Sequence, residues 1–177
     1  MPAATDKWHP ASTNAAAVNN SSNDNCSIVG LSLSKTTFNC TNLGPNNVVL
    51  TVTDNCMNSA TCASTITVSY MQPPIAKCRN AVVVLSTAGN GSISAAGINN
   101  ASTDLCSSNG LTLSLSKTTF NCSNVGSNVV TLTVTNVAGN SSTCTATVTV
   151  KDLTKPVAKC KPAMITVPEG TTVTLPA

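Results

Sequence analysis

The chain has 177 residues, of which 41% are hydrophobic, 8% are charged and only 2% are aromatic, and its formal net charge is +3. The basic residues are scattered, and one Trp and one Tyr cannot form a stacking surface for bases, so we expect no binding to nucleic acid. The hydrophobic content and the alternation of β-branched with polar residues exclude a disordered chain. Small β-formers with few charges are typical of an all-β extracellular scaffold.

The sequence contains no grouping of residues that is typical of catalysis or metal binding. Its single histidine, His9, lies near the N-terminus, its carboxylates stand singly and it has no CxxC pair. We therefore expect no enzyme activity, no metal and no cofactor. No run reaches the roughly 18 apolar residues of a membrane-spanning helix. The opening MPAATDKWHP lacks the apolar region of a signal peptide, so an export signal has been removed or the sequence is incomplete.

Residues 1–15 match no part of the repeat that follows, and we predict that they form an N-terminal arm. This overhang favours a chain that starts near residue 1. Trp8 is the only tryptophan. It is either a solvated tail residue or an anchor of the arm on a neighbouring molecule, because tryptophan is often the hot spot of an interface.

Residues 16–72 and 73–152 read as two copies of one repeat. The decapeptide LSLSKTTFNC begins at Leu31 in the first copy and at Leu113 in the second, an offset of 82. Cysteines recur at the same offset, or at 80 before the decapeptide, where the second copy has two more residues. Repetition with this period indicates an array of similar modules.

Each copy reads as a series of short strands. The segments NVVTLTVTNV and STCTATVTV alternate threonine with valine or leucine, which indicates strands with one buried face. Glycines mark the turns between strands: Gly139 in NVAGNSS, Gly126 in NVGSN and Gly44 in NLGPN. About seven short strands in about 80 residues predict an all-β fold of two tandem immunoglobulin-like sandwich modules. The first module, 16–72, lacks its N-terminal strand, whereas 73–152 is complete.

The order P-x-A-K-C, D-x-C, F-x-C, V-x-L-T-V-T and G-N-S-S-T-C resembles the hyalin-repeat (HYR-like) modules of secreted bacterial surface proteins. The resemblance covers residues 16–177. It implies an adhesive or structural module at the cell surface and names no ligand. The first copy departs from the pattern, because TDNCMNSATC replaces the Gly-Asn turn and adds Cys56.

The four cysteines of the complete module allow three pairings. We pair the cysteine that opens the first strand with the one on the last strand, because a sandwich can bring these strands together. The remaining two flank one strand and its return, and we pair them as a local clip. The same rule clips the first module. The predicted bonds within modules are therefore Cys78–Cys144, Cys106–Cys122 and Cys26–Cys40.

Two cysteines have no partner within their own module. Cys62 needs an AKC cysteine before Cys26, and the sequence has none. Cys160 is an AKC cysteine in the C-terminal segment, 153–177, with no module after it. We predict an intersubunit disulfide between Cys62 and Cys160. The alternative pairs Cys56 with Cys62 in a short loop and leaves Cys160 free.

The C-terminal segment reads as a donor strand for the incomplete module of another copy. Aligned on the second copy it ends near Gly97, and the first copy resumes at Val18, opposite Ile98. Cys62 to Cys78 and Cys144 to Cys160 both span 16 residues, so the segment heads onward and a head-to-tail, non-closing assembly is simplest. The predicted donor residues are Ala163, Met164, Ile165, Thr166, Val167, Val173 and Leu175.

These observations predict a structural subunit of an extracellular or cell-surface filament, whose partners are copies of itself. The alternative is a fragment of a multi-repeat cell-surface adhesin that serves as a binding or spacer module, since cuts separated by whole repeats give the same ends. The sequence names no surface ligand. Several N-x-S/T sequons occur, but a chain this rich in Asn, Ser and Thr produces them by chance.

Overall fold

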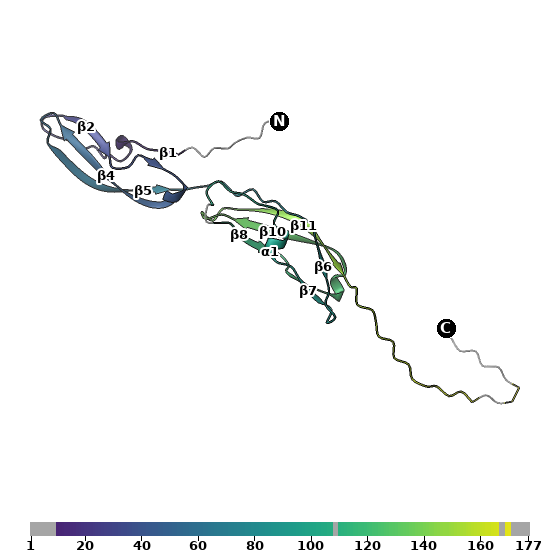
Figure 1. Cartoon of the computed structure of the whole chain (residues 1–177). Helices are drawn as coiled ribbons and strands as arrows, with labels where there is room; N and C mark the ends of the chain where they lie inside the picture. Colours follow the sequence, from purple (N-terminus) through teal and green to yellow (C-terminus); the bar gives the residue numbers. More distant parts are fainter. Residues whose placement is uncertain (1–9, 108–109, 167–168, 171–177) are drawn as a thin grey trace, which may run out of the picture.

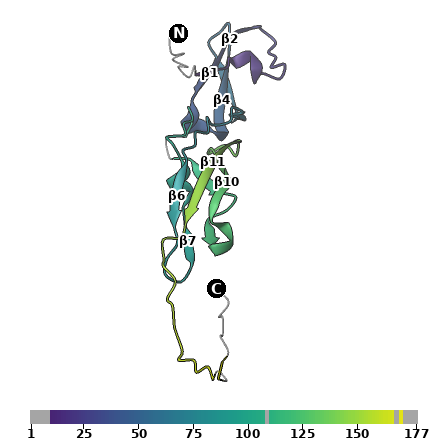
Figure 2. The same ribbon diagram turned by 90° about the vertical axis from the view of Figure 1, so that its right-hand side faces the viewer.

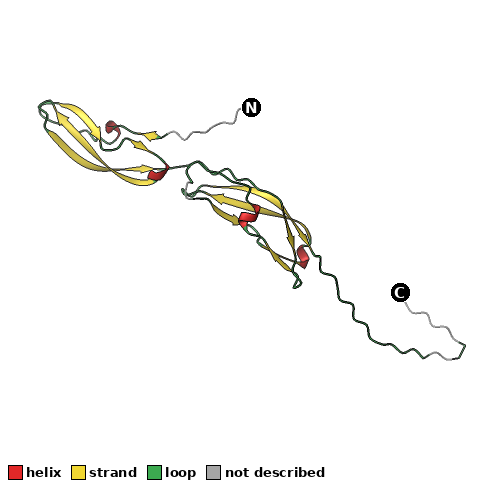
Figure 3. Ribbon diagram, in the orientation of Figure 1, coloured by secondary structure: helices red, strands yellow, loops and turns green. Residues whose placement is uncertain are grey.

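A computed structural model shows an all-β chain with a few short helical turns (Figure 3). It describes residues 10–107, 110–166 and 169–170. The strands pair in two separate groups, which we call the N-terminal unit (residues 10–68) and the C-terminal unit (residues 75–151). The two units follow one another end to end, and an extended C-terminal segment leaves the second (Figures 1 and 2).

The N-terminal unit contains a three-stranded antiparallel sheet in the order β2-β4-β5 and a short pair, β1 with β3. Leu50 and Val48 of β4 are 1% exposed, and Phe38 of β3 is 3% exposed. These three are its buried apolar side chains among the described residues. The elements are β1 (Ala11–Ser12), η1 (Ala15–Ala17), β2 (Ile28–Leu33), β3 (Thr37–Phe38), η2 (Cys40–Asn42), β4 (Gly44–Asp54) and β5 (Ser59–Val68).

The C-terminal unit contains a four-stranded sheet in the order β6-β11-β10-β8 and a second pair, β7 with β9. Strand β6 runs parallel to β11, whereas the other neighbours are antiparallel. The elements are β6 (Ala81–Val84), β7 (Asn90–Ser92), α1 (Ala95–Ile98), β8 (Thr112–Leu115), β9 (Thr119–Asn121), η3 (Cys122–Asn124), β10 (Gly126–Thr135) and β11 (Ser141–Lys151).

The alternation in the sequence explains the core of the C-terminal unit. Val130, Leu132 and Val134 of β10 are all 0% exposed, and the threonines between them lie on the other face. Ile98 of α1, also 0% exposed, belongs to the same core cluster. Gly126 starts β10 with a φ of 107°, in the left-handed region that glycine adopts without steric cost. The apolar positions that alternate with threonine along β10 are thus core positions of the fold.

The structure corrects the predicted start of the first unit. Residues 1–15 were expected to be an arm, but Ala11 and Ser12 form β1, with Ala11 opposite Phe38. Gly91 of β7 lies opposite Phe120 in the same way. The repeat therefore extends further back than residue 16, as ASTNAAAVNN (11–20) against GSISAAGINN (91–100) shows. Trp8 lies outside the described residues.

Candidate functional site

The outer edge of β5 is an unpaired sheet edge. Among the described residues β5 pairs only with β4, from Gly44 opposite Val68 to Thr53 opposite Ser59. In the C-terminal unit the equivalent strand β11 lies between β10 and β6. The unpaired N–H and C=O groups along β5 are a template for a further strand.

The side chains of β5 are also less covered than those of β11. Val148 and Val150 of β11 are 0% and 1% exposed, because Val83 and the following Leu85 complete their core. Ile66 and Val68 of β5 occupy the equivalent positions and are only partly buried. The N-terminal unit therefore leaves apolar surface in contact with water at the edge where its backbone is unpaired.

One predicted disulfide is present within the C-terminal unit. Cys78 is bonded to Cys144, with their Cα atoms 5.8 Å apart. The bond attaches the segment before β6 to β11. In the N-terminal unit Cys62 faces Leu50 across β4 and β5, as Cys144 faces Leu132 across β10 and β11.

The two predicted local clips are wrong, because Cys40 is bonded to Cys106, with a Cα–Cα distance of 5.1 Å. Cys26 precedes β2, whose first residue pairs with the last residue of β4, whereas Cys40 starts η2, the short turn before the beginning of β4. Strand β4 has 11 residues, so Cys26 and Cys40 lie at opposite ends of roughly 30 Å of strand, far beyond disulfide reach. The same geometry separates Cys106 from Cys122.

All nine cysteines lie in the described part of the chain, and five are free and exposed. The alternative bond between Cys56 and Cys62 does not form in the structure, where Cys56 lies in the turn between β4 and β5. The free cysteines are Cys26, Cys56, Cys62, Cys122 and Cys160.

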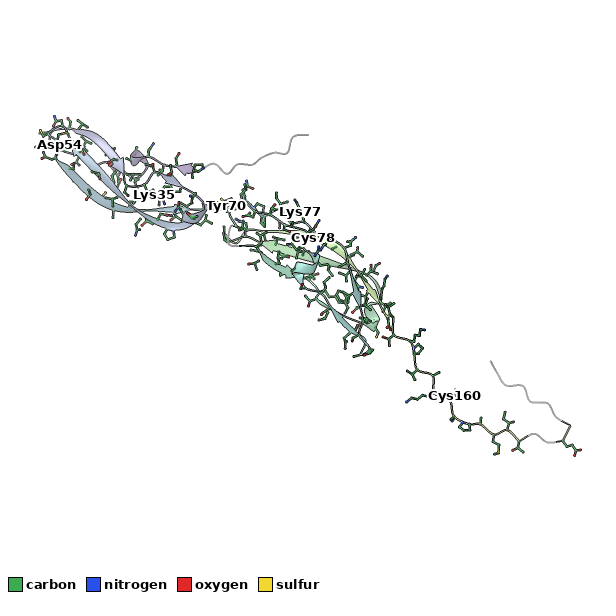
Figure 4. All side chains as sticks on the ribbon, in the orientation of Figure 1. Lys35, Asp54, Tyr70, Lys77, Cys78 and Cys160 are labelled. Carbon is green, nitrogen blue, oxygen red and sulfur yellow. A yellow bond between two sulfur atoms is a disulfide. The ribbon has the colours of Figure 1, made fainter. Side chains whose placement is uncertain are left out.

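The predicted donor segment extends away from both units. Residues 152–166 are exposed and form no strand, and Cys160 projects from this extended stretch (Figure 4). Met164 is 94% and Ile165 49% exposed. Ala163 and Thr166 are also exposed. Three further predicted donor residues, Val167, Val173 and Leu175, lie outside the described residues.

Side chains of the C-terminal unit hold the linker between the units by hydrogen bonds to the backbone of the linker. The amide of Asn140 donates to the Tyr70 carbonyl at 2.6 Å, and that of Asn136, which is 5% exposed, donates to the Gln72 carbonyl at 2.8 Å. The Tyr70 hydroxyl donates to Asp104 at 3.4 Å. Burial raises the pKa of Tyr70, and the charge of Asp104 adds to the rise. Sequence reasoning missed this joint because its partners are about 30 or more residues apart.

No protein-family model matches the chain, and a comparison with curated proteins finds no match. Within residues 10–107, 110–166 and 169–170, no three His, Cys, Asp or Glu side chains gather into a metal-binding group. No helix in that part of the chain is long and apolar enough to cross a membrane.

Proposed function

We propose that the protein is a structural subunit of an extracellular filament, joined head to tail by donor-strand complementation. In this proposal each unit is an immunoglobulin-like module. The first lacks a strand, which the C-terminal segment of a neighbouring copy supplies. The observation that carries the proposal is the unpaired edge of β5, with the partly exposed Ile66 and Val68 beneath it.

The repeat supplies a register for the donated strand. In the C-terminal unit Val148 lies opposite Ala81, and Val150 lies opposite Val83. Shifted by one repeat, this register sets Ile66 opposite Ala163 and Val68 opposite Ile165. A parallel ladder of this kind satisfies the backbone groups of β5.

The same register defines the inner and outer faces of the donor. Val83 is 5% exposed and Val82 is 58% exposed. Their equivalents are Ile165, which would enter the core, and Met164, which would face solvent. Burying one isoleucine side chain contributes about 1.5–3 kcal/mol, so a few inward residues and the ladder give a stable joint.

The direction of the donor segment favours an open chain of copies. Cys160 lies beyond the C-terminal unit, on the side away from the N-terminal unit (Figure 4). A contact between the head of one copy and the tail of the next does not close, and it therefore produces a filament. In the completed module Cys62 and Cys160 take the positions of Cys144 and Cys78, and we propose that they form an intersubunit disulfide. The two disulfides within the chain favour an oxidising, extracellular location.

The two faces of the donor allow a matched test. Ile165→Asp places a charge in the proposed groove, whereas Met164→Asp places the same charge on the solvent side of the same strand. We expect filaments by electron microscopy from wild type and Met164→Asp, and monomers from Ile165→Asp. Assembly by both variants would contradict strand donation. A monodisperse wild-type chain at high concentration would support the spacer module of a longer adhesin instead.

A further inference from the structure

We propose that a second disulfide joins neighbouring copies, between Cys122 of one copy and Cys26 of the next. The inference rests on the proposed head-to-tail assembly and adds a bond at a different place in the same joint. Each junction would then have two covalent links, one through the donated strand and one through the ends of the two modules.

The bond between Cys40 and Cys106 is the template, because it joins the two units of one chain end to end. Cys122 occupies in the C-terminal unit the place of Cys40, directly after the β9 strand. Cys26 occupies in the N-terminal unit the place of Cys106: Cys26 precedes β2, which pairs with β4, and Cys106 precedes β8, which pairs with β10. Suppose that a second copy follows the C-terminal unit in the same way as the C-terminal unit follows the N-terminal unit. Cys26 of that second copy would then lie beside Cys122 of the first.

The backbone that presents Cys122 is built like the one that presents Cys40. Both cysteines start a short 3-10 turn that an asparagine caps, with φ and ψ of −136° and −176° at Asn39 and −138° and −173° at Asn121. The side chain of each capping asparagine accepts a hydrogen bond from the backbone N–H two residues later, at 2.9 Å in the first turn and at 3.0 Å in the second. The backbone around Cys122 therefore already matches that around the bonded Cys40, yet Cys122 is free and exposed.

Cys122 also lies in a hollow at the outer end of the C-terminal unit. Gly89 lines this hollow together with Thr154 and Pro156 of the C-terminal segment. Its thiol lies 3.8 Å from the Gly89 carbonyl oxygen. The hollow places the thiol beside the segment that leads to the next module.

The loop that presents Cys26 is equally matched to that of Cys106. The amide of Cys26 donates to Asp24 at 2.7 Å, and the amide of Cys106 donates to Asp104 at 2.9 Å. Both loops thus hold their cysteine by an Asp two residues earlier. Cys106 is 4% exposed within its bonded joint, whereas Cys26 is exposed.

The N-terminal unit repeats the pair of side chains that contacts the linker in the C-terminal unit. In the C-terminal unit the Ser102 hydroxyl donates a hydrogen bond to the Asn99 side chain at 2.6 Å. The same hydroxyl accepts a hydrogen bond from the backbone N–H of Lys77, in the linker, at 2.9 Å. Asn19 holds the Ser22 hydroxyl at the same 2.6 Å. In the described residues no linker reaches Ser22, and the repeat assigns this place to Lys159 of the preceding copy.

The equal lengths of the two linkers support the same placement. SYMQPPIAKC (69–78) leads into the C-terminal unit, and KDLTKPVAKC (151–160) has the same number of residues. Ile75 bridges to Thr103 within the chain. The shifted pair is Val157, which is 82% exposed, and Asn23 of the next copy. The second linker can therefore repeat the path of the first.

The bond forms by thiol–disulfide exchange with a small-molecule or protein disulfide. The Cys122 thiolate attacks that disulfide and releases one thiol. The Cys26 thiolate then attacks the mixed disulfide at the Cys122 sulfur and releases the second thiol. Two cysteine thiols are oxidised, one external disulfide is reduced, and both protons pass to the released thiolates.

The test uses full-length chains assembled under oxidising conditions and boiled in SDS without reductant. The double variant Cys62→Ser/Cys160→Ser removes the disulfide of the proposed function, and we expect its ladder of covalent oligomers to persist. Adding Cys122→Ser should collapse that ladder to one band near 17.9 kDa. Cys56→Ser is the matched control for removal of an exposed thiol and should leave the wild-type ladder intact.

The outcomes separate the two proposals. The double variant Cys62→Ser/Cys160→Ser could form filaments by electron microscopy and yet run as a monomer on the gel. That result would overturn the second disulfide and would leave strand donation intact. A wild-type chain that forms no filaments would overturn both. Mass spectrometry of unreduced wild-type filaments needs no variant: a peptide joining Cys26 to Cys122 supports the inference, and Cys26 joined to any other cysteine contradicts it.

Discussion

Cys62 on β5 and Cys144 on β11 occupy the same place in two copies of one sheet, but only Cys144 is bonded. Each lies opposite a buried leucine, Leu50 for Cys62 and Leu132 for Cys144. The difference is the segment before β6, which brings Cys78 to Cys144. By the repeat, the cysteine equivalent to Cys78 is Cys160, which we propose as the partner of Cys62.

Thiol labelling should follow assembly. In the monomer all five free cysteines are exposed, so alkylation without reduction should add five labels to each chain. In filaments we expect Cys26, Cys62, Cys122 and Cys160 to be protected and Cys56 alone to react. Intact-mass spectrometry of the reduced, labelled chains gives the count. Continued labelling of Cys62 in filaments would exclude its bond to Cys160.

The strand that we propose to be missing from the first module should appear as a difference in stability loss between two equivalent valines. Val150→Ala removes methyl groups from a side chain that is 1% exposed, and we expect a loss of about 2 kcal/mol in the unfolding free energy of the C-terminal unit. Val68→Ala should cost clearly less in the monomer, because Val68 is only partly buried there. In filaments Val68→Ala should cost as much as Val150→Ala. Denaturant unfolding of monomers and filaments measures both, and equal losses in the monomer would argue against an incomplete first module.

The joint between the units can be followed through Tyr70, the only tyrosine of the chain. Burial raises its pKa in the folded state, so its contribution to stability is full below the ordinary value of about 10 and is lost as pH rises through the folded value. An absorbance titration of the phenolate should therefore give a midpoint above 10. Asp104→Asn should lower that midpoint part of the way, because the charge is the lesser cause. A midpoint at or below 10 would mean that the joint is open in solution.

Much of the fold could be predicted from the sequence, because the repeat and the alternation of valine with threonine are local signals. The bond between Cys78 and Cys144 followed from treating the first and last strands as neighbours. The bond between Cys40 and Cys106 could not be found in this way, because each module was assumed to satisfy its own cysteines. The two bonds share one regularity that is visible in the sequence: each joins cysteines that are 66 residues apart.

The start of the first unit was missed for a different reason. The resemblance of residues 11–20 to 91–100 rests on Ala, Ser and Asn, which are common throughout this chain and carry little information singly. Only the pairing of Ala11 with Phe38 makes it visible. The linker contacts of Asn136 and Asn140 were also beyond prediction, because nothing in a polar turn sequence indicates which distant carbonyl it binds.

Complementation in trans should show directly whether the C-terminal segment completes the first module. A chain that ends at Thr154 keeps the unpaired edge of β5 but carries no donor. A synthetic peptide of residues 155–177 should bind this edge and raise the melting temperature of the N-terminal unit. The stabilisation grows with peptide concentration, to about 2.7 kcal/mol at one hundred times the dissociation constant.

Two control peptides make the result specific. The peptide with Ile165→Asp should give no shift, because its charge would lie where Val83 lies in the C-terminal unit, a position only 5% exposed. The peptide with Met164→Asp should act as the natural sequence does, because the equivalent Val82 is 58% exposed. Equal shifts from all three would indicate nonspecific binding to the exposed apolar edge. No shift in melting temperature from the natural peptide would contradict donation of this strand to the edge of β5. The edge would then bind a different partner.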